Sequence, residues 1–535
     1  MFVLRYFLSK DFFKKGCITM KPKYYITTAI AYASAIPHIG NVYEIILADA
    51  IARFKRLEGY DVYFQTGTDD HGQKIEQNAK NNDLTPKEYT DMISGEIKRI
   101  YDLVNISYDN FIRTTDDDHV KVVQNMFEKL IKKDDIYLGK YEGWYSIADE
   151  SFLSESDVVD GKGPSGDIPV WMSEDTYFFR LSKYQERLID HISKNPSFIE
   201  PDSRRNEILN NFLTQKLPDL SISRTSFDWG IKILSDPKHV VYVWIDALSN
   251  YITKIGYDVN ESSPLFKKLW PADLHLVGKD VMRFHTVYWP IILMALDLEL
   301  PKQVFGHPWV LVDRNKMSKS KGNTLYTDEL VKHFGVDPIR YYVLHEIPYK
   351  EDGNITYELV IERNNSDLAN TIGNLLNRTI GMVNKYQEGL VKKVTIKEPF
   401  EINLKEKSLA IHEKIVNFMD QLKVGDALEE LMILARAANK YIDVSKPWEL
   451  LKNNELDKVS HVLYNLVETI RFIAVHLQAF LPESADKIFK QLNIEKSGFE
   501  SIVEFGLYPE QKIGEASPIF VRYKMDDKLN EILGN

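Results

Sequence analysis

A turn at residues 37–41, with the sequence PHIGN, carries side chains suited to binding a phosphate. His38 and Asn41 can donate hydrogen bonds, and Gly40 lets a nucleotide approach the backbone closely. Free N–H groups and the dipole at the start of a following helix would attract the same anion. A lone histidine near a turn is more often structural, so this segment alone is a weak signal.

A second segment, KMSKSKG at residues 316–322, holds three lysines and two serines. Mobile lysines such as Lys316 and Lys319 can neutralise the charge that develops on a leaving pyrophosphate. A basic run is more commonly a solvated loop. That interpretation weakens here, because both segments occur in this order, about 280 residues apart, within one split α/β pattern.

The elements around the first segment predict a β-α-β unit. Residues 24–29 read as a buried strand, 42–57 as an amphipathic helix that stops before Gly59, and 62–64 as the next strand. This start predicts a Rossmann-like parallel sheet, which binds ligands at the carboxyl ends of its strands. Further strands are predicted at 239–245, 274–277 and 304–312. From about residue 366 the pattern is nearly all helical, as at 409–422 and 459–477.

Composition excludes several classes of protein. With 44% hydrophobic and 27% charged residues, the chain is neither disordered nor collagen-like, and its 535 residues indicate about three or four domains. The single cysteine, Cys17, excludes an intrachain disulfide and a multi-cysteine zinc knuckle. A net charge of −11 argues against nonspecific coating of nucleic acid, but it permits a local basic surface. No apolar run reaches the roughly 18 residues of a membrane span.

Together the two segments are the signature of class I aminoacyl-tRNA synthetases, and the chain from about Lys23 onward closely resembles the methionyl-tRNA synthetase family. Further segments strengthen the resemblance. They are TAIAY at 28–32, TDDHG at 68–72, YVWIDA at 242–247, GKDVMRFH at 278–285 and KPW at 446–448. An apolar, aromatic pocket would suit the polarizable thioether of methionine, with Tyr32 and His285 marking the sulfur end.

The resemblance implies a set of site residues. The methionine pocket would comprise Ala29, Ile30, Tyr32, Trp244, Ala247, Tyr251, Val281, His285 and Trp289, with Asp70 holding the α-ammonium group. ATP would contact His38, Gly40, Asn41, Gly278, Asp280 and Lys319, with Lys279 beside the ribose segment. The residues acting on the transition state would be His38, Lys319, Asn41 and Lys316. Anticodon readers would be Asn374, Arg378, Pro447 and Trp448, among which Trp448 suits base stacking.

The resemblance also implies the reaction and its partners. The carboxylate of L-methionine attacks the α-phosphate of ATP, which magnesium accompanies, and pyrophosphate leaves. The terminal ribose hydroxyl of initiator or elongator tRNA(Met) then takes the methionyl group from the adenylate. Neither step needs a protein nucleophile, so the residues act by positioning and charge stabilisation. No membrane is involved.

On this basis the chain divides into six parts: an N-terminal extension (1–20), the first half of the Rossmann-like catalytic domain (21–135), an inserted connective module (136–235), the second half (236–315), a lysine-loop stem-contact region (316–365) and a helical anticodon-binding bundle (366–535). The insertion is too short for a separate editing domain. Because the chain ends soon after the bundle, we expect a monomer.

Three positions depart from the family pattern. Asn41 stands where His is usual, so the side chain can donate a hydrogen bond but cannot carry charge. Ser146 stands near the position of a zinc-binding cysteine, and with Cys17 alone a four-cysteine site is impossible, which predicts a zinc-free, bacterial type of module. Pro308 replaces a frequent glycine and has no N–H to offer adenine.

Several alternatives remain open. Residues 1–20 are basic and partly apolar, and either an extension or misplaced start, or a targeting peptide, explains them. A cytoplasmic location is preferred because the resemblance is to a bacterial subtype, and an organelle stays open through residues 1–20. Rival functions are a synthetase for another apolar amino acid, a small nucleotidyltransferase, and a non-enzymatic paralogue that only binds tRNA. The aromatic pocket opposes the first, the helical C-terminal region the second, and the retained His38, Asp70, Asp280 and Lys319 the third.

Overall fold

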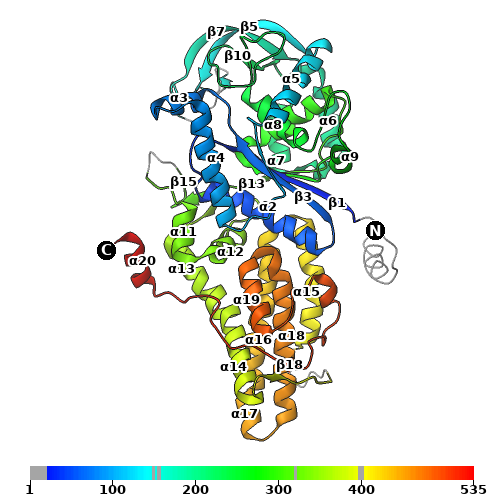
Figure 1. Ribbon diagram of the computed structural model, residues 1–535, viewed down its shortest axis with the longest axis vertical. Coiled ribbons are helices and arrows are strands. Elements are labelled where there is room, and N and C mark those ends of the chain that lie inside the picture. Colours follow the sequence, from blue (N-terminus) through cyan, green and yellow to red (C-terminus); the bar gives the residue numbers. More distant parts are fainter. Residues whose placement is uncertain are drawn as a thin grey trace.

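A seven-stranded sheet forms the centre of the catalytic region in this computed structural model (Figure 1). The structure describes residues 21–147, 151–153, 158–164, 166–317, 322–395 and 403–534, of which 151 and 152 are described by their backbone alone. Its order is β2-β3-β1-β12-β13-β8, and β4 also pairs with β3. Every pairing in this sheet is parallel. The strands are β1 (Lys23–Thr28), β2 (Ala31–Tyr32), β3 (Asp61–Asp69), β4 (Asn110–Arg113), β8 (Ile199–Glu200), β12 (Leu274–Gly278) and β13 (Val304–His307). The predicted Rossmann-like sheet is confirmed.

Helix α2 (Ile39–Leu57) follows the first strands and begins three residues before the predicted start. The reason is a reciprocal cap at its N-terminus. Gly40 N–H donates to Nδ1 of His38 over 3.1 Å, and His38 N–H donates to Oδ1 of Asn41 over 3.2 Å. Two otherwise unsatisfied backbone donors are thereby paired, so the helix extends into the phosphate-binding turn.

Helices cover both faces of the sheet. One core cluster runs from α2 into the C-terminal helices, whereas the other joins α5 (Asp117–Lys132), α8 (Val243–Thr253) and α10 (Trp289–Ala295). Next to the sheet lie α3 (Gln73–Asn81), α4 (Pro86–Leu103) and α9 (Pro264–Leu269). Because α2 belongs to the first cluster, the helix that starts at the predicted phosphate-binding turn is packed against the helical bundle.

Of the predicted strands, one is wrong, and another corresponds to two separate strands in the structure. Residues 239–245 hold only the short β11 (Val240–Val241), after which α8 starts at Val243, because a brief apolar run looks alike in a buried strand and a buried helix. The predicted 304–312 strand is β13 followed by β14 (Val310–Val312). Strand β14 pairs with β15 (Asn315–Lys316) and β16 (Gly353–Asn354).

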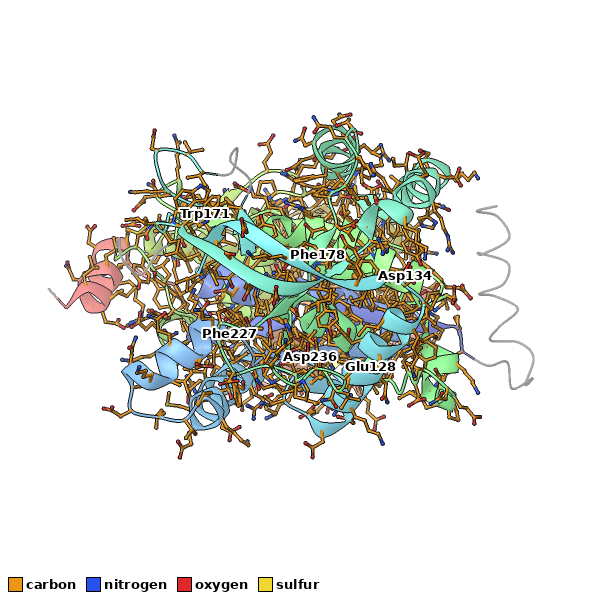
Figure 2. All side chains as sticks on the ribbon, turned by 90° about the horizontal axis from the view of Figure 1, so that it is seen from above. Glu128, Asp134, Trp171, Phe178, Phe227 and Asp236 are labelled. Atoms are coloured by element: carbon orange, nitrogen blue, oxygen red, sulfur yellow. The ribbon has the colours of Figure 1, made fainter. Side chains whose placement is uncertain are left out.

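The inserted segment forms its own antiparallel sheet, with order β6-β5-β7-β9. Seen from above in Figure 2, β5 and β7 cross the top of the molecule, with Trp171 and Phe178 on β7. The elements are β5 (Ile136–Ser146), β6 (Ser151–Leu153), β7 (Val170–Phe179), α6 (Gln185–Lys194), α7 (Asp202–Glu207), β9 (Leu220–Ser221) and β10 (Ser223–Arg224). Within this stretch β8 returns to the central sheet and pairs with β13.

The C-terminal part is helical, as predicted, and lies below the sheet in Figure 1. Its helices are α11 (Thr327–Phe334), α12 (Val336–Glu346), α13 (Tyr357–Arg363), a π-helical segment (Asn364–Gly373), α14 (Asn374–Gln387), α15 (Leu404–Asp420), α16 (Val424–Ser445), α17 (Pro447–Lys452), α18 (Leu456–Phe480), α19 (Pro482–Leu492) and α20 (Met525–Leu533). The short β17 (Leu390–Val391) and β18 (Gln511–Lys512) pair beside them. Among the described residues, no helix is long and apolar enough to cross a membrane.

A buried ion pair joins the sheet to the bundle. Asp49 of α2 and Arg340 of α12 are both fully buried, with 2.7 Å between Oδ2 and the guanidinium. Arg53 and Ser107 complete the shell around the Asp49 carboxylate. Burial opposes its ionisation, but Arg340 and Arg53 outweigh that effect and hold the pKa of Asp49 below its usual range.

Arg340 also binds two helix ends. Its Nε donates to the Phe480 carbonyl at the end of α18 over 2.9 Å, and a terminal nitrogen donates to the Val104 carbonyl after α4 over 3.0 Å. These carbonyls lie where a helix leaves its last acceptors unpaired. One guanidinium therefore joins α2, α4, α12 and α18.

Replacing Asp49 by alanine should lower the free energy of unfolding by about 3–5 kcal/mol, because it leaves a buried guanidinium without its carboxylate. Urea unfolding followed by circular dichroism measures this loss. Lys87→Ala, in the exposed pair with Asp91, is the matched control and should cost less than about 1 kcal/mol. Equal losses in the two variants would show that the Asp49 pair does not hold the junction.

Candidate active site at the carboxyl ends of the parallel strands

The two phosphate-binding segments meet in the structure. A Cβ atom on Gly40 would lie 2.9 Å from Cε of Met317, so the start of α2 and the Met317 side chain are in close contact. Ile39 N–H donates to the Leu325 carbonyl over 3.0 Å, and His38 forms a β-bridge with Tyr326. The start of α2 and the chain on both sides of the lysine loop are therefore held together. Lys319 itself lies outside the described residues.

His38 has a defined hydrogen-bonding state at this turn. Its Nδ1 accepts the Gly40 N–H, so in the neutral ring the hydrogen resides on Nε2. The predicted partner Asn41 is exposed and caps the same helix through its side chain. A side-chain amide at position 41 thus supports the turn without adding charge beside His38.

A tryptophan that the sequence analysis did not single out organises the cations of this region. The ammonium groups of Lys279 and Lys316 lie 4.1 and 4.2 Å from the centroid of the Trp309 ring. Lys279 also pairs with Asp352 over 2.6 Å, and the main-chain N–H of Trp309 donates to the same carboxylate over 3.0 Å. Aromatic residues beside lysine-rich segments are the signal that would have found it.

The segment predicted to contact adenosine lies next to this cluster. Gly278 is opposite His307 in the β12–β13 register, and a Cβ on Gly278 would come within 2.6 Å of Oδ1 of Asp280. His307 bonds Glu44 of α2 over 2.9 Å. Burial raises the pKa of Glu44, and the Glu44 carboxylate raises the pKa of His307 against the effect of burial.

Aromatic side chains form a compact cluster, the aromatic wall of the predicted methionine pocket. Trp244 stacks on Phe284 with 3.8 Å between centroids and 6° between planes, and Tyr251 packs against Trp289. The structure brings together the predicted Trp244 and Tyr251 of α8 with Val281, His285 and Trp289 from the following elements. The predicted Ala247 is buried on the same helix. Phe284 was missed, although it is the neighbour of His285 in the sequence.

Hydrogen bonds fix the histidines of this pocket in neutral tautomers. His285 Nδ1 must donate to the Val281 carbonyl at 2.9 Å, so its Nε2 accepts the Tyr251 hydroxyl at 2.7 Å. Burial lowers the pKa of His285 to about 4. His275, which the sequence analysis also missed, accepts Trp289 N–H at Nε2 and bonds Thr27 at Nδ1. The side chains of this wall therefore form hydrogen bonds with one another but carry no charge at neutral pH.

Asp70, predicted to hold an ammonium group, has other partners in the structure. Its fully buried carboxylate bonds Arg113 over 2.6 Å, Ser94 over 2.8 Å and Thr115 over 3.0 Å. Ser94 also bonds Thr68, two positions earlier on β3. Asp70 therefore belongs to the face of the strand that is turned toward α4.

The adjacent Asp69 lies on the opposite face. Successive side chains of a strand alternate, so Asp69 shares a face with Gln65, whose side chain bonds Asn250 of α8 at 3.0 Å. Asp69 is also in register with Tyr32 of β2, beside the half-buried Ala29 and Ile30. The aromatic wall and Asp69 consequently lie on the same side of the sheet.

The predicted anticodon readers come from α14 and α17, and α17 lies at the lower end of the bundle in Figure 1, far from the sheet. Arg378 of α14 pairs with Asp443 over 2.9 Å, and Asn374 bonds Asn439 over 3.2 Å, both on α16. Pro447 is buried at the start of α17, whereas Trp448 is 42% exposed. A large aromatic ring is thus partly exposed to solvent at the start of α17.

One group of described residues has metal-ligand character. Ligand atoms of His345, Glu346 and Asp367 lie within 4.8 Å of one another. Arg363 pairs with both carboxylates, at 3.0 and 3.8 Å, so the group already forms an ion-pair network. In the insertion, Ser146 bonds the Asp167 carboxylate at 2.8 Å.

Comparison with known proteins gives a consistent result. The family described as tRNA synthetases class I (M) matches residues 24–168 and 163–380, and the anticodon binding domain of methionyl tRNA ligase matches 397–508. Methionine–tRNA ligases of Clostridium acetobutylicum and Bacillus subtilis are 52% and 46% identical over 96% of this chain, covering 80% and 79% of their own lengths. The methionyl-tRNA synthetase of Mycobacterium tuberculosis in complex with methionyl-adenylate is 41% identical with a TM-score of 0.89, covering 94% of this chain and 100% of that one.

The neutral state of His285 predicts acid sensitivity of the fold. Between pH 6.5, the ordinary histidine pKa, and about 4, the unfolded chain binds more protons here, so the free energy of unfolding falls as pH is lowered. The contribution is on the order of 3 kcal/mol by pH 4. Urea unfolding from pH 7 to 4.5 should show a shallower dependence in His285→Gln than in the wild type. An equal fall in the free energy of unfolding with pH in the two proteins would contradict this prediction.

Proposed function

This chain belongs to the methionine–tRNA ligase family of class I aminoacyl-tRNA synthetases, and on that premise we propose how its residues divide the reaction. The protein is an ATP-dependent ligase that joins methionine to tRNA. In the first step the methionine carboxylate attacks the α-phosphate of ATP, giving methionyl-adenylate and pyrophosphate. In the second, the terminal ribose hydroxyl of tRNA(Met) takes the methionyl group.

The contact between Gly40 and Met317 is the observation that best supports this division. It brings the start of α2 to Met317, at the beginning of the lysine-rich segment, at the carboxyl ends of the strands. Free N–H groups of α2 and the Nε2 hydrogen of His38 would hold the phosphates, which enter with magnesium as the substrate complex. Lys316 and Lys319 would neutralise charge as pyrophosphate leaves. Gly278 and Asp280 would face the adenosine.

The neutral aromatic wall would bind the side chain of methionine. Trp244, Tyr251, His285 and Trp289 offer polarizable surface without charge, which suits a thioether better than a polar or ionic side chain. Because Tyr251 donates to His285, the hydroxyl and imidazole hold each other in place. The pocket would therefore select methionine by shape and polarizability, with Tyr32, Ala29 and Ile30 closing the opposite side.

We assign the α-ammonium group to Asp69 and give Asp70 a structural role. Asp69 lies on the pocket side of β3 in register with Tyr32, whereas Asp70 is bonded to Arg113, Ser94 and Thr115 on the other side. A carboxylate close to the pocket stabilises an ammonium ion by a charge-assisted hydrogen bond. This assignment differs from the one that the sequence suggests by a single residue.

We further propose that the insertion works without structural zinc, because Cys17 is the only cysteine of the chain and Ser146 bonds Asp167. Stoichiometric, tightly bound zinc in metal analysis of the purified protein would contradict this.

ATP–pyrophosphate exchange with each of the twenty amino acids in parallel tests the function. Exchange should depend on methionine alone, because the wall offers no partner for a polar side chain. Exchange with another apolar amino acid at a comparable kcat/KM would point to a related synthetase. No exchange with any amino acid would leave a protein that only binds tRNA.

Asp69→Asn should raise the KM for methionine about tenfold or more in this assay, because it removes the charge paired with the ammonium ion. Its KM for ATP should stay within about twofold of the wild type. Asp70→Asn is the matched comparison, and its main effect should be a lower melting temperature from the weakened Arg113 network. The reverse pattern would return the ammonium role to Asp70.

Trp448→Ala should raise the KM for tRNA(Met) in aminoacylation roughly tenfold, since a base stacked on an aromatic ring contributes about 1–3 kcal/mol. Methionine-dependent pyrophosphate exchange should be unchanged, because α17 lies far from the sheet in Figure 1. Trp448→Phe keeps an aromatic face and should restore most of the affinity. Normal charging by the alanine variant would exclude a stacking role.

A further inference from the structure

A buried carboxylate that none of the roles above uses bridges two histidines. Asp246 lies in the first turn of α8, and its side chain is 1% exposed. One of its oxygens is 2.7 Å from Nδ1 of His71, and the other is 2.7 Å from Nε2 of His119. Each carboxylate oxygen can only accept, so both imidazoles donate to it.

The two histidines come from different elements. His71 lies two residues after Asp69, the last residue of β3, and its ring packs edge-on against Trp229 with 5.4 Å between centroids. His119 is on α5, and its Nδ1 bonds the Thr253 hydroxyl at the end of α8 over 2.7 Å. Asp246 thus joins the helix of the aromatic wall both to the end of β3 and to the helix that leads into the insertion.

The position of this bridge matters for the pocket. On α8, Asp246 stands between Trp244 and Ala247, so its side chain fixes the helical turn from which both project. On β3, the tie to His71 fixes the chain just beyond Asp69. The bond between Gln65 and Asn250 ties the same two elements one helical turn further on. Two ties between the same strand and helix determine both their separation and their register.

We propose that Asp246 is a positioning residue for methionine binding, which sets the aromatic wall of α8 against the strand end that carries Asp69. This inference deepens the proposed function and rests on it. Asp246 does not touch the substrate; it acts through His71, and it ties the same wall to the insertion through His119. A displacement of 1 Å of α8 or of the strand end that carries Asp69 would separate the contact to the ammonium group from the contacts to the side chain. Both sets of contacts must act on one methionine at the same time.

Asp246→Asn tests the bridge with the smallest change in volume. Asparagine offers one acceptor oxygen in place of two, so one imidazole loses its partner. In pyrophosphate exchange the KM for methionine should rise at least tenfold, with the KM for ATP within about twofold. The preference for methionine over norleucine should fall as well, because the wall that distinguishes them is displaced.

Two variants of His71 separate positioning from folding. In His71→Asn the side-chain nitrogen replaces Nδ1 as a donor to Asp246, so most of the methionine affinity should be kept. In His71→Leu the donor is gone, and the KM for methionine should rise as in Asp246→Asn. The double variant His71→Leu with Asp246→Asn should be no worse than Asp246→Asn alone, because both remove the same tie.

Lys254→Gln is the control, since Lys254 at the end of α8 joins this helix to Asp116 and Asp118 through a partly exposed ion pair and does not bond Asp246 or either histidine. It should leave the KM for methionine unchanged. An unchanged KM for methionine in His71→Leu, or equal KM increases for methionine and ATP, would overturn the inference. If the wild type shows no methionine-dependent exchange, the proposed function itself fails, and the two failures are distinguishable.

Discussion

The buried pairing of Asp49 with Arg340 is the constraint on which the arrangement of this protein depends. Helix α2 begins at the phosphate-binding turn and carries Asp49 about three turns later, so one helix holds both a part of the active site and the anchor of the bundle. A charge taken into the interior is tolerated only with its partner in place. The orientation of α2 relative to α12 and α18 follows from that requirement, and with it the position of His38 and Gly40.

Charge is distributed unevenly between the two halves of the proposed active site. On the nucleotide side, lysines, Asp280, Asp352 and the Glu44–His307 pair surround the ends of β12 and β13. On the methionine side, burial and directed hydrogen bonds keep His275 and His285 neutral. This separation suits a reaction in which a polyanion and a nearly apolar side chain must be bound a few ångströms apart.

Much of this could be predicted from the sequence, because the parallel sheet, the helical C-terminal region and the phosphate-binding turn depend on local patterns. Residues 239–245 could not, since a short apolar run does not distinguish strand from helix. Our proposal of Asp69 in place of Asp70 needed the face of β3, which is visible only through partners such as Ser94 and Asn250. Phe284, His275 and Trp309 were missed for the same reason: their roles come from stacking and tautomers across elements distant in sequence. The division into domains and the anticodon readers remain predictions.

Arg340 reaches α4 and α18 through main-chain carbonyls and not through side chains. A carbonyl is present whatever residue occupies the position, so positions 104 and 480 have to supply only an apolar side chain of suitable size, as Val104 and Phe480 do. On two of the four helices that Arg340 joins, its hydrogen bonds therefore do not depend on which side chain occupies the bonded position. Substitutions can accumulate on α4 and α18 while the recognition of their ends stays constant.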